Sequence, residues 1–232
     1  MKKFKLTKET KVTLCGVTLY RIQATSTFGN VTKGDLGGWV EKEENLNQTS
    51  DAWVYGDAMV SGNAEVNGDA WVSGNAEVNG DAWVSGNARV SGDARVYGDA
   101  RVSGNARVYG DAMVSGDAMV SGDARVYGNA RVYGDARVSG NAWVYGDAMV
   151  SGNARVYGDA DITKPVLNFL NFAGYGLTAY CDFIQIGCKL HTKKEWAKIF
   201  KDKTYSDLLR GNDYEKYKLA YKFILSLDKL DK

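Results

Sequence analysis

Arginine and aromatic residues recur in this chain at intervals of eighteen residues, in two neighbouring rows. The members that form a contiguous set are Arg89, Arg107, Tyr109, Arg125, Tyr127, Trp143 and Tyr145. A guanidinium group binds phosphate through paired hydrogen bonds, and aromatic rings stack on a planar base. If the fold aligns these rows, they form a platform for an anionic, nucleotide-like ligand. The same residue types are enriched at protein interfaces, so a subunit interface or a protein-docking surface is the alternative.

The interval of eighteen is three times the length of a shorter repeat. A valine occupies every sixth position from Val54 to Val156, Ile162 continues the series, and each unit reads V-x-G-[DN]-A-x. A period of six holds one short strand and one turn, because side chains alternate along a strand and glycine permits the positive φ of a tight corner. Three units close a triangular coil with Val and Ala inside. The sequence therefore predicts an all-β solenoid, a parallel β-helix of about six to seven coils.

The chain is predicted to have three parts. Residues 1–50 form an N-terminal cap and a degenerate first coil, residues 51–162 form the hexapeptide-repeat β-helix, and residues 163–232 form a small C-terminal α/β unit. Within the cap, Val12–Ile22 predicts two strands around a turn, and Gly34–Val40 predicts an irregular rung. A cap is expected because an open solenoid end exposes apolar residues and unpaired strand edges. The C-terminal unit is expected to close the other end of the prism or to mediate assembly.

The C-terminal unit carries clear signals for a hairpin and two helices. Gly174–Cys188 predicts the hairpin, and Thr192-Lys-Lys-Glu195 is a capping-box pattern that opens a helix ending near Phe200. A second helix is predicted from Asp213 to about Leu227. The residues expected on its apolar face are Tyr214, Tyr217, Tyr221, Ile224 and Leu225.

The composition argues against a nucleic-acid binder, a membrane protein and a zinc protein. Residues 54–161 carry eight arginines against fourteen acidic residues and no lysine, which argues against a general nucleic-acid binder. The chain has no apolar run of eighteen residues, so no membrane span is expected. Cys15, Cys181 and Cys188 are an odd number without a CxxC pair, which favours a reduced, cytoplasmic setting and gives no credible zinc site.

A row of aspartates offers a second kind of chemistry. Asp81, Asp99, Asp117 and Asp135 are eighteen residues apart and are predicted to stack along one corner. Such a row of carboxylates is a possible Ca²⁺ site, but the repeat lacks the glycine-rich pattern of calcium-binding β-rolls. Local turn hydrogen bonds are the expected role, and no metal site is predicted.

The V-x-G-[DN]-A repeat resembles the left-handed parallel β-helix of hexapeptide-repeat proteins. The resemblance implies left-handed coils and side-by-side assembly as a homotrimer. Acyltransferases with this fold use a histidine base and bind coenzyme A between subunits. Here the repeats contain no histidine, and the chain's only histidine is His191, in the C-terminal unit. We therefore expect a non-enzymatic protein with no catalytic residues and no cofactor, with an acyltransferase-like enzyme as the alternative.

Motifs on both sides of the repeat narrow the resemblance further. Together with the repeats, Leu19–Ile22, Gly34–Glu41, Asn45–Leu46, Ile184–Cys188 and His191–Trp196 resemble a group of phage- and prophage-encoded hexapeptide-repeat proteins. The resemblance implies a phage origin and action in the cytoplasm of the host bacterium, but it transfers no catalytic residue. It favours an accessory protein that counters host defence, by sequestering a nucleotide signal or by docking a defence protein. A structural or assembly protein is the remaining alternative.

Overall fold

The chain divides into two compact units, which are described separately. A computed structural model describes residues 2–164, 166–172, 175–180, 183–187, 189–201 and 213–227. The repeat unit is Met1–Thr163, and the C-terminal unit is Lys164–Lys232.

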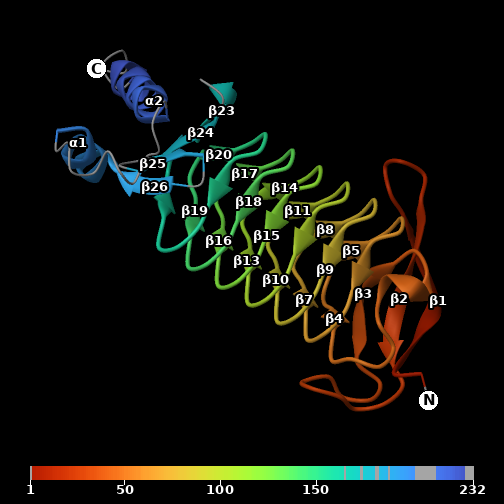
Figure 1. Cartoon of the computed structure of the whole chain (residues 1–232). Coiled ribbons are helices and arrows are strands. Elements are labelled where there is room, and N and C mark those ends of the chain that lie inside the picture. Colours follow the sequence, from red (N-terminus) through yellow and green to blue (C-terminus); the bar gives the residue numbers. More distant parts are fainter. Residues whose placement is uncertain are drawn as a thin grey trace. The chain divides into compact units, whose positions relative to one another are not determined.

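The hexapeptide repeats form a parallel β-helix, as predicted (Figure 1). Each repeat contributes a two-residue strand made of the valine and the residue before it, and strands eighteen residues apart pair in register, as Arg107 does with Arg125. Backbone N–H groups of one coil donate to carbonyl oxygens of the next, such as Arg107 N to Ala124 O at 2.9 Å. The described repeat unit makes about seven turns.

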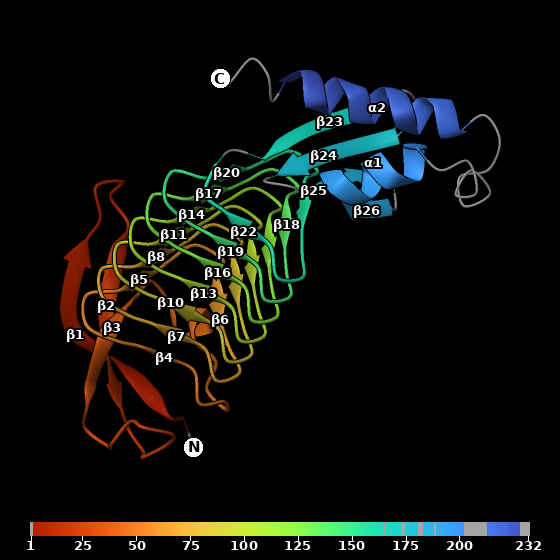
Figure 2. The ribbon, with the colours of Figure 1, turned by 90° about the vertical axis from the view of Figure 1, so that its left-hand side faces the viewer.

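Each face of the prism is one sheet of stacked strands (Figure 2). The first sheet consists of β4 (Trp53–Val54), β7 (Trp71–Val72), β10 (Arg89–Val90), β13 (Arg107–Val108), β16 (Arg125–Val126), β19 (Trp143–Val144) and β22 (Asp161–Ile162). The parallel part of the second sheet consists of β5 (Met59–Val60), β8 (Glu77–Val78), β11 (Arg95–Val96), β14 (Met113–Val114), β17 (Arg131–Val132) and β20 (Met149–Val150). The third sheet consists of β6 (Glu65–Val66), β9 (Trp83–Val84), β12 (Arg101–Val102), β15 (Met119–Val120), β18 (Arg137–Val138) and β21 (Arg155–Val156).

The inside of the prism contains the valines and alanines of the repeat, and nearly all of them are fully buried. The corner glycines have φ between +59° and +74°, a region that L-residues rarely adopt. They are also tightly stacked, since a Cβ added to Gly80 would lie 2.9 Å from the backbone nitrogen of Gly98. Glycine is thus required at the corners both for backbone conformation and for the close approach of successive coils.

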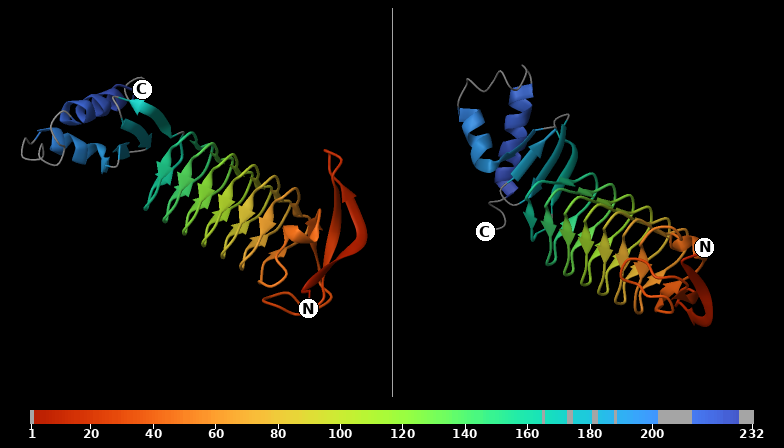
Figure 3. Two further views of the ribbon diagram at one scale, coloured as in Figure 1. Left: turned by 45° about the vertical axis from the view of Figure 1, so that its right-hand side comes forward. Right: turned by 90° about the horizontal axis from the view of Figure 1, so that it is seen from below.

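The N-terminal part is antiparallel and continues the second sheet (Figure 3). β1 (Phe4–Val12) pairs with β2 (Thr18–Ala24) across the predicted turn, and β2 pairs with β3 (Leu36–Val40). β3 then pairs in parallel with β5 of the solenoid. The predicted strands and degenerate first coil are therefore present, and the hairpin extends the solenoid edge instead of leaving it open.

The first coil is two residues longer than the others. Val40 pairs with Val60 and Leu46 bridges to Val66, a spacing of twenty, whereas Val54 pairs with Val72 at the usual eighteen. The extra length falls after the 3₁₀ turn η1 (Glu43–Asn45). At the end of η1, the buried side chain of Asn45 donates to Ala64 O at 2.9 Å and so takes the place of a backbone donor.

The sequence Gly34-Asp-Leu-Gly-Gly-Trp-Val has a steric explanation. A Cβ at Gly37 would lie 2.5 Å from the Ile22 side chain, and one at Gly38 would lie 2.6 Å from Ala58 O. Trp53 packs beneath this segment with only 1% of its surface exposed, in edge contacts with Phe4 and Phe28. Trp53 lies eighteen residues before Trp71, in a series whose other side chains face outward, but the cap covers it.

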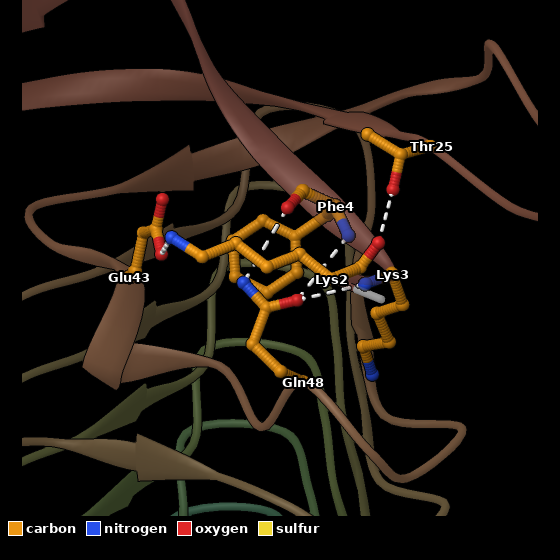
Figure 4. Close-up of polar contacts among 6 residues, drawn as sticks. All are labelled: Lys2, Lys3, Phe4, Thr25, Glu43 and Gln48. Carbon is orange, nitrogen blue, oxygen red and sulfur yellow. Dashed lines mark hydrogen bonds and ion pairs between the residues drawn. The ribbon is translucent and has the colours of Figure 1, made fainter.

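The start of β1 is tied to the first coil by side-chain hydrogen bonds (Figure 4). Gln48 Oε1 accepts from the backbone N–H of Lys3 at 2.9 Å and of Phe4 at 3.3 Å. The Thr25 hydroxyl donates to the carbonyl oxygen of Lys2. These contacts hold an otherwise free strand end against the prism.

Lys3 is a buried cation in this cap, with 5% of its surface exposed. Its ammonium group donates to Ser50 O at 2.5 Å and Ala52 O at 2.6 Å, and lies 4.7 Å from the centre of the Phe28 ring. Burial lowers the pKa of Lys3 from 10.5 to about 8, although the nearby Asp51 carboxylate opposes that shift. The cap therefore contains a lysine that loses its proton more easily when the chain is folded.

The C-terminal unit is a four-stranded antiparallel sheet, within the described residues, with two helices. Its strands and helices are β23 (Leu167–Phe172), β24 (Tyr175–Tyr180), β25 (Phe183–Ile186), β26 (Lys189–Thr192), α1 (Lys193–Lys201) and α2 (Asp213–Leu227). β24 and β25 form the predicted hairpin, while Gly174, Cys181 and Cys188 lie outside the described residues.

Both predicted helices are present at the predicted positions. Thr192 Oγ1 accepts from Glu195 N at 3.1 Å, and Glu195 Oε2 accepts from Thr192 N at 2.8 Å, which completes the capping box. These hydrogen bonds lower the pKa of the Glu195 carboxyl. From α2, Tyr217, Ala220 and Ile224 are buried against the sheet. Ala220 therefore belongs to the apolar face, which the sequence pattern did not predict, whereas Leu225 is only half-buried.

We expect Gly80→Ala to lower the free energy of unfolding more than Gly158→Ala. Both glycines have φ above +70°, so each substitution costs about 1–2 kcal/mol of backbone strain. A Cβ at Gly158 has no heavy atom within 4 Å, whereas one at Gly80 overlaps the next coil, which should add about 1–3 kcal/mol. Urea unfolding of both variants measures the difference. Equal losses would show that the coils separate freely at their corners.

A second expectation concerns Lys3 and pH. Between pH 8 and 10.5 the unfolded chain holds a proton on this lysine that the folded chain has lost, so stability rises with pH in that window. The free energy of unfolding of the unmodified protein, relative to Lys3→Met, should increase by about 1 kcal/mol from pH 7 to pH 9. Lys2→Met, at an exposed site, is the control. Parallel pH profiles for the unmodified protein and Lys3→Met would contradict the assignment.

Candidate functional site

The predicted site residues come together on the first sheet. Arg89, Arg107, Arg125 and Trp143 occupy successive rungs and are paired in register. The tyrosines lie two residues further along the same rungs, on the same side of the sheet. We call this surface the Arg–aromatic face; its members are Trp71, Arg89, Arg107, Tyr109, Arg125, Tyr127, Trp143 and Tyr145.

The tyrosines form a continuous stack. The rings of Tyr109 and Tyr127 are 4.8 Å apart with an interplanar angle of 1°, and those of Tyr127 and Tyr145 are 5.0 Å apart at 3°. Their spacing follows that of the strands, about 4.8 Å. Burial raises the pKa of the Tyr127 phenol, and its neighbour Tyr109 adds to the increase. The Tyr127 phenol therefore remains neutral near pH 7 and does not balance the charge of the arginines.

The arginines are spread along the face by two tryptophans. The Arg89 guanidinium lies 5.1 Å from the centre of the Trp71 ring, and the Arg125 guanidinium lies 4.7 Å from that of Trp143. The two outer arginines thus lean toward opposite ends of the row and leave Arg107 between them. Cation–π contact replaces part of the hydration of a guanidinium and reduces the repulsion between successive rungs. Trp71 belongs to the same eighteen-residue series, so a tryptophan stands at each end of the arginine row.

These arginines lack an acidic partner within the chain as described. Among the described residues the salt bridge is Lys2–Glu43, in the N-terminal part, and it involves none of the three arginines. Arg89 and Arg107 are exposed, and Arg125 is half-buried. Three unpaired guanidinium groups beside a row of ring faces can bind a phosphate or carboxylate and stack a planar group.

The other two faces differ from the Arg–aromatic face. The second sheet mixes Met, Glu and Arg, with Tyr133 exposed at 36%. The third sheet exposes Trp83 at 44% beside a row of serines. Neither face has a stacked pair of rings among the described residues, whereas the first sheet has two. The eighteen-residue spacing predicted the aligned columns of side chains, but the direction of each side chain is visible only in the structure.

The corner residues mainly bond to one another. Asn75 donates to Asp93 at 2.9 Å, and Asn129 donates to Asp147 at 3.0 Å, in each case from one coil to the next. The corner with Asp81, Asp99, Asp117 and Asp135 lacks asparagine between these aspartates. Within the described residues no group of three or more His, Cys, Asp or Glu side chains is placed to hold a metal ion.

His191 has a structural position in the C-terminal unit. It lies in β26 opposite Ile184, and its ring meets Trp196 edge-on with centroids 4.8 Å apart. Trp196 is fully buried in the core of this unit and donates to Ile184 O at 2.8 Å. His191 therefore packs at the edge of that core, next to the start of α1.

Comparisons with known proteins support the repeat fold. Eight overlapping segments between residues 82 and 146 match the family described as YdcK Beta solenoid repeat. A curated relative, the uncharacterized acetyltransferase YdcK of Escherichia coli (strain K12), is 34% identical over 77 residues. That similarity covers 27% of this chain and 24% of the relative, so the chain spans about a quarter of the relative's length. These findings place the repeats among β-solenoid repeat proteins. No helix in the described part of the chain is long and apolar enough to span a membrane.

We expect the contact between Arg125 and Trp143 to stabilise the fold measurably. In a double-mutant cycle of Arg125→Ala and Trp143→Ala, the coupling energy should be about 0.5–1 kcal/mol, as for exposed cation–π pairs. The control cycle pairs Arg107→Ala with Trp143→Ala, which are two rungs apart and should couple by less than about 0.5 kcal/mol. Urea unfolding is the measurement, because it adds no salt. Equal coupling in both cycles would mean that Arg125 does not stack on the tryptophan.

Proposed function

We propose that this protein is a non-enzymatic binding protein that holds an anionic, nucleotide-like ligand on the Arg–aromatic face. The observation that supports this most directly is the in-register row of Arg89, Arg107 and Arg125, which lacks acidic partners among the described residues and lies beside the tyrosine stack. Successive strands are about 4.8 Å apart, so like charges on neighbouring rungs repel each other. A bound anion would relieve this repulsion, and the tyrosines would stack the planar part of the ligand.

The proposal includes a setting and an assembly. The resemblance of the chain to phage and prophage proteins favours action in the cytoplasm of a host bacterium, against a defence system that uses a nucleotide signal. A homotrimer is the proposed assembly, because the resemblance to hexapeptide-repeat proteins implies prisms that pack side by side. A host protein docked on the same face is the other occupant that its chemistry would suit, since Trp, Tyr and Arg dominate protein interfaces.

A second candidate function is acyl transfer, which is favoured by the name of the Escherichia coli relative. Such an enzyme would bind acetyl-coenzyme A and lose activity in His191→Ala. The edge-on packing of His191 against Trp196 supports a structural role for that residue. A purely structural or assembly protein would form concentration-dependent polymers and bind no small molecule.

The double variant Arg107→Ala and Arg125→Ala tests the proposed site. We expect it to lose ligand binding while its free energy of unfolding stays within about 1 kcal/mol of the unmodified protein, because surface substitutions rarely cost more. Arg101→Ala with Arg137→Ala, on the third sheet, is the matched control and should bind normally. Loss of the trimer in the first variant, with no ligand bound by the unmodified protein, would make the face a subunit interface.

Native mass spectrometry of protein purified from bacterial cytoplasm measures both the number of subunits and the mass of any ligand that stays bound. The proposal predicts a trimer with extra mass that is released on unfolding. A ligand-free trimer that also fails to bind nucleotides would contradict it and would direct the search to host proteins.

A further inference from the structure

The tyrosine row is interrupted over two consecutive rungs. At the position after each valine, the first sheet carries Tyr55, Ser73, Ser91, Tyr109, Tyr127 and Tyr145. The backbone is regular through the interruption, because Ser73 N donates to Val90 O and Ser91 N to Val108 O, both at 2.9 Å. The rungs are thus unchanged, and only the rings are missing.

Tyr109 ends the stack with one ring face open toward the interruption. Its other face stacks on Tyr127, and among the described residues no further ring or cation contacts it. At the opposite end, Tyr55 leans on Trp71 with centroids 5.1 Å apart. Three rung spacings, about 14 Å, separate the backbones of Tyr55 and Tyr109. The intervening surface has two serines and is wide enough for a flat ring lying parallel to Tyr109.

Two arginines border the same stretch. Arg89 lies on the same rung as Ser91, two residues before it, so that their backbones are about 7 Å apart along the strand. Arg107 lies on the next rung, which carries Tyr109. Both arginines are exposed. A group stacked over Ser91 would therefore have cations at the distance that a sugar–phosphate unit spans.

We infer that this interruption is the recognition site of the face, and that it takes a planar ring joined to a phosphate group. The inference rests on the proposed function and specifies where and how it operates. The ring stacks on the open face of Tyr109 above Ser91, and the serine hydroxyls are available to the edge of the ring. The phosphate binds Arg107, and Arg89 turns from Trp71 to meet it.

The other sheets lack this combination among the described residues. On the second sheet Tyr97 and Tyr133 stand two rungs apart, with Ser115 between them. On the third sheet the corresponding row is Asn67, Ser85, Ser103, Ser121, Ser139 and Tyr157, which has arginines beside it but no stacked pair. The first sheet alone joins an existing ring stack, an open rung and unpaired arginines.

The variant Ser91→Tyr tests the site by filling the rung beside Tyr109, so that the open ring face moves one rung away, over Ser73 and further from Arg107. The new ring extends the tyrosine stack, so folding is preserved, and the arginines stay in place. Ser103→Tyr is the matched control, because both serines lie in the sequence Arg-Val-Ser-Gly but on different sheets. The probes are adenosine monophosphate, which has a planar base and a phosphate, and ribose 5-phosphate, which has the sugar and phosphate but no planar base. Calorimetry at low salt gives both dissociation constants.

In the unmodified protein, adenosine monophosphate should bind at least tenfold more tightly than ribose 5-phosphate, which is about 1.4 kcal/mol. Ser91→Tyr should remove this preference and leave ribose 5-phosphate binding unchanged, while Ser103→Tyr should change neither. The inference is wrong if the unmodified protein binds ribose 5-phosphate as tightly as adenosine monophosphate. It is also wrong if Ser91→Tyr still prefers adenosine monophosphate. In both cases the proposed anion site stands. If neither probe binds the unmodified protein, both are wrong.

Discussion

The stacking of each rung on the rung eighteen residues later is the constraint on which the rest of the structure depends. Backbone hydrogen bonds near 2.9 Å join successive coils, and the glycine corners approach so closely that a Cβ would overlap the next coil. Because the register is the same in every coil, residues at equal positions form straight columns. The valines and alanines become a continuous core, and the outer residues become ladders along three faces.

Such ladders have both a cost and a use. Repeating arginine on adjacent rungs places like charges about 4.8 Å apart, which is unfavourable, whereas repeating tyrosine at that spacing gives stacked rings. The first sheet moderates the repulsion by ending its arginine row in tryptophan on both sides, at Trp71 and Trp143. The central Arg107 is left with the greatest need for an anion, beside an aromatic column that suits a planar ligand.

The regularity of the repeat also explains why the ends are different. A solenoid needs its edges covered, and the N-terminal hairpin does this by continuing the second sheet. The close approach of Gly37 and Gly38 to Ile22 and Ala58 fixes this hairpin against the first coil. The buried ammonium of Lys3 then satisfies carbonyl groups that the irregular first coil leaves free.

The sequence alone determined the period, the parallel coils, the inward Val and Ala and the alignment of Arg107, Tyr109, Arg125 and Tyr127, since all of these follow from a strict six-residue repeat. It also determined the capping box at Thr192, which is local. Only the tertiary structure decided the burial of Trp53, because Phe4 of β1 and Phe28 of the loop after β2 cover it. The lean of Arg89 and Arg125 toward tryptophan and the open face of Tyr109 were likewise decided there, since side-chain direction depends on neighbours eighteen residues away.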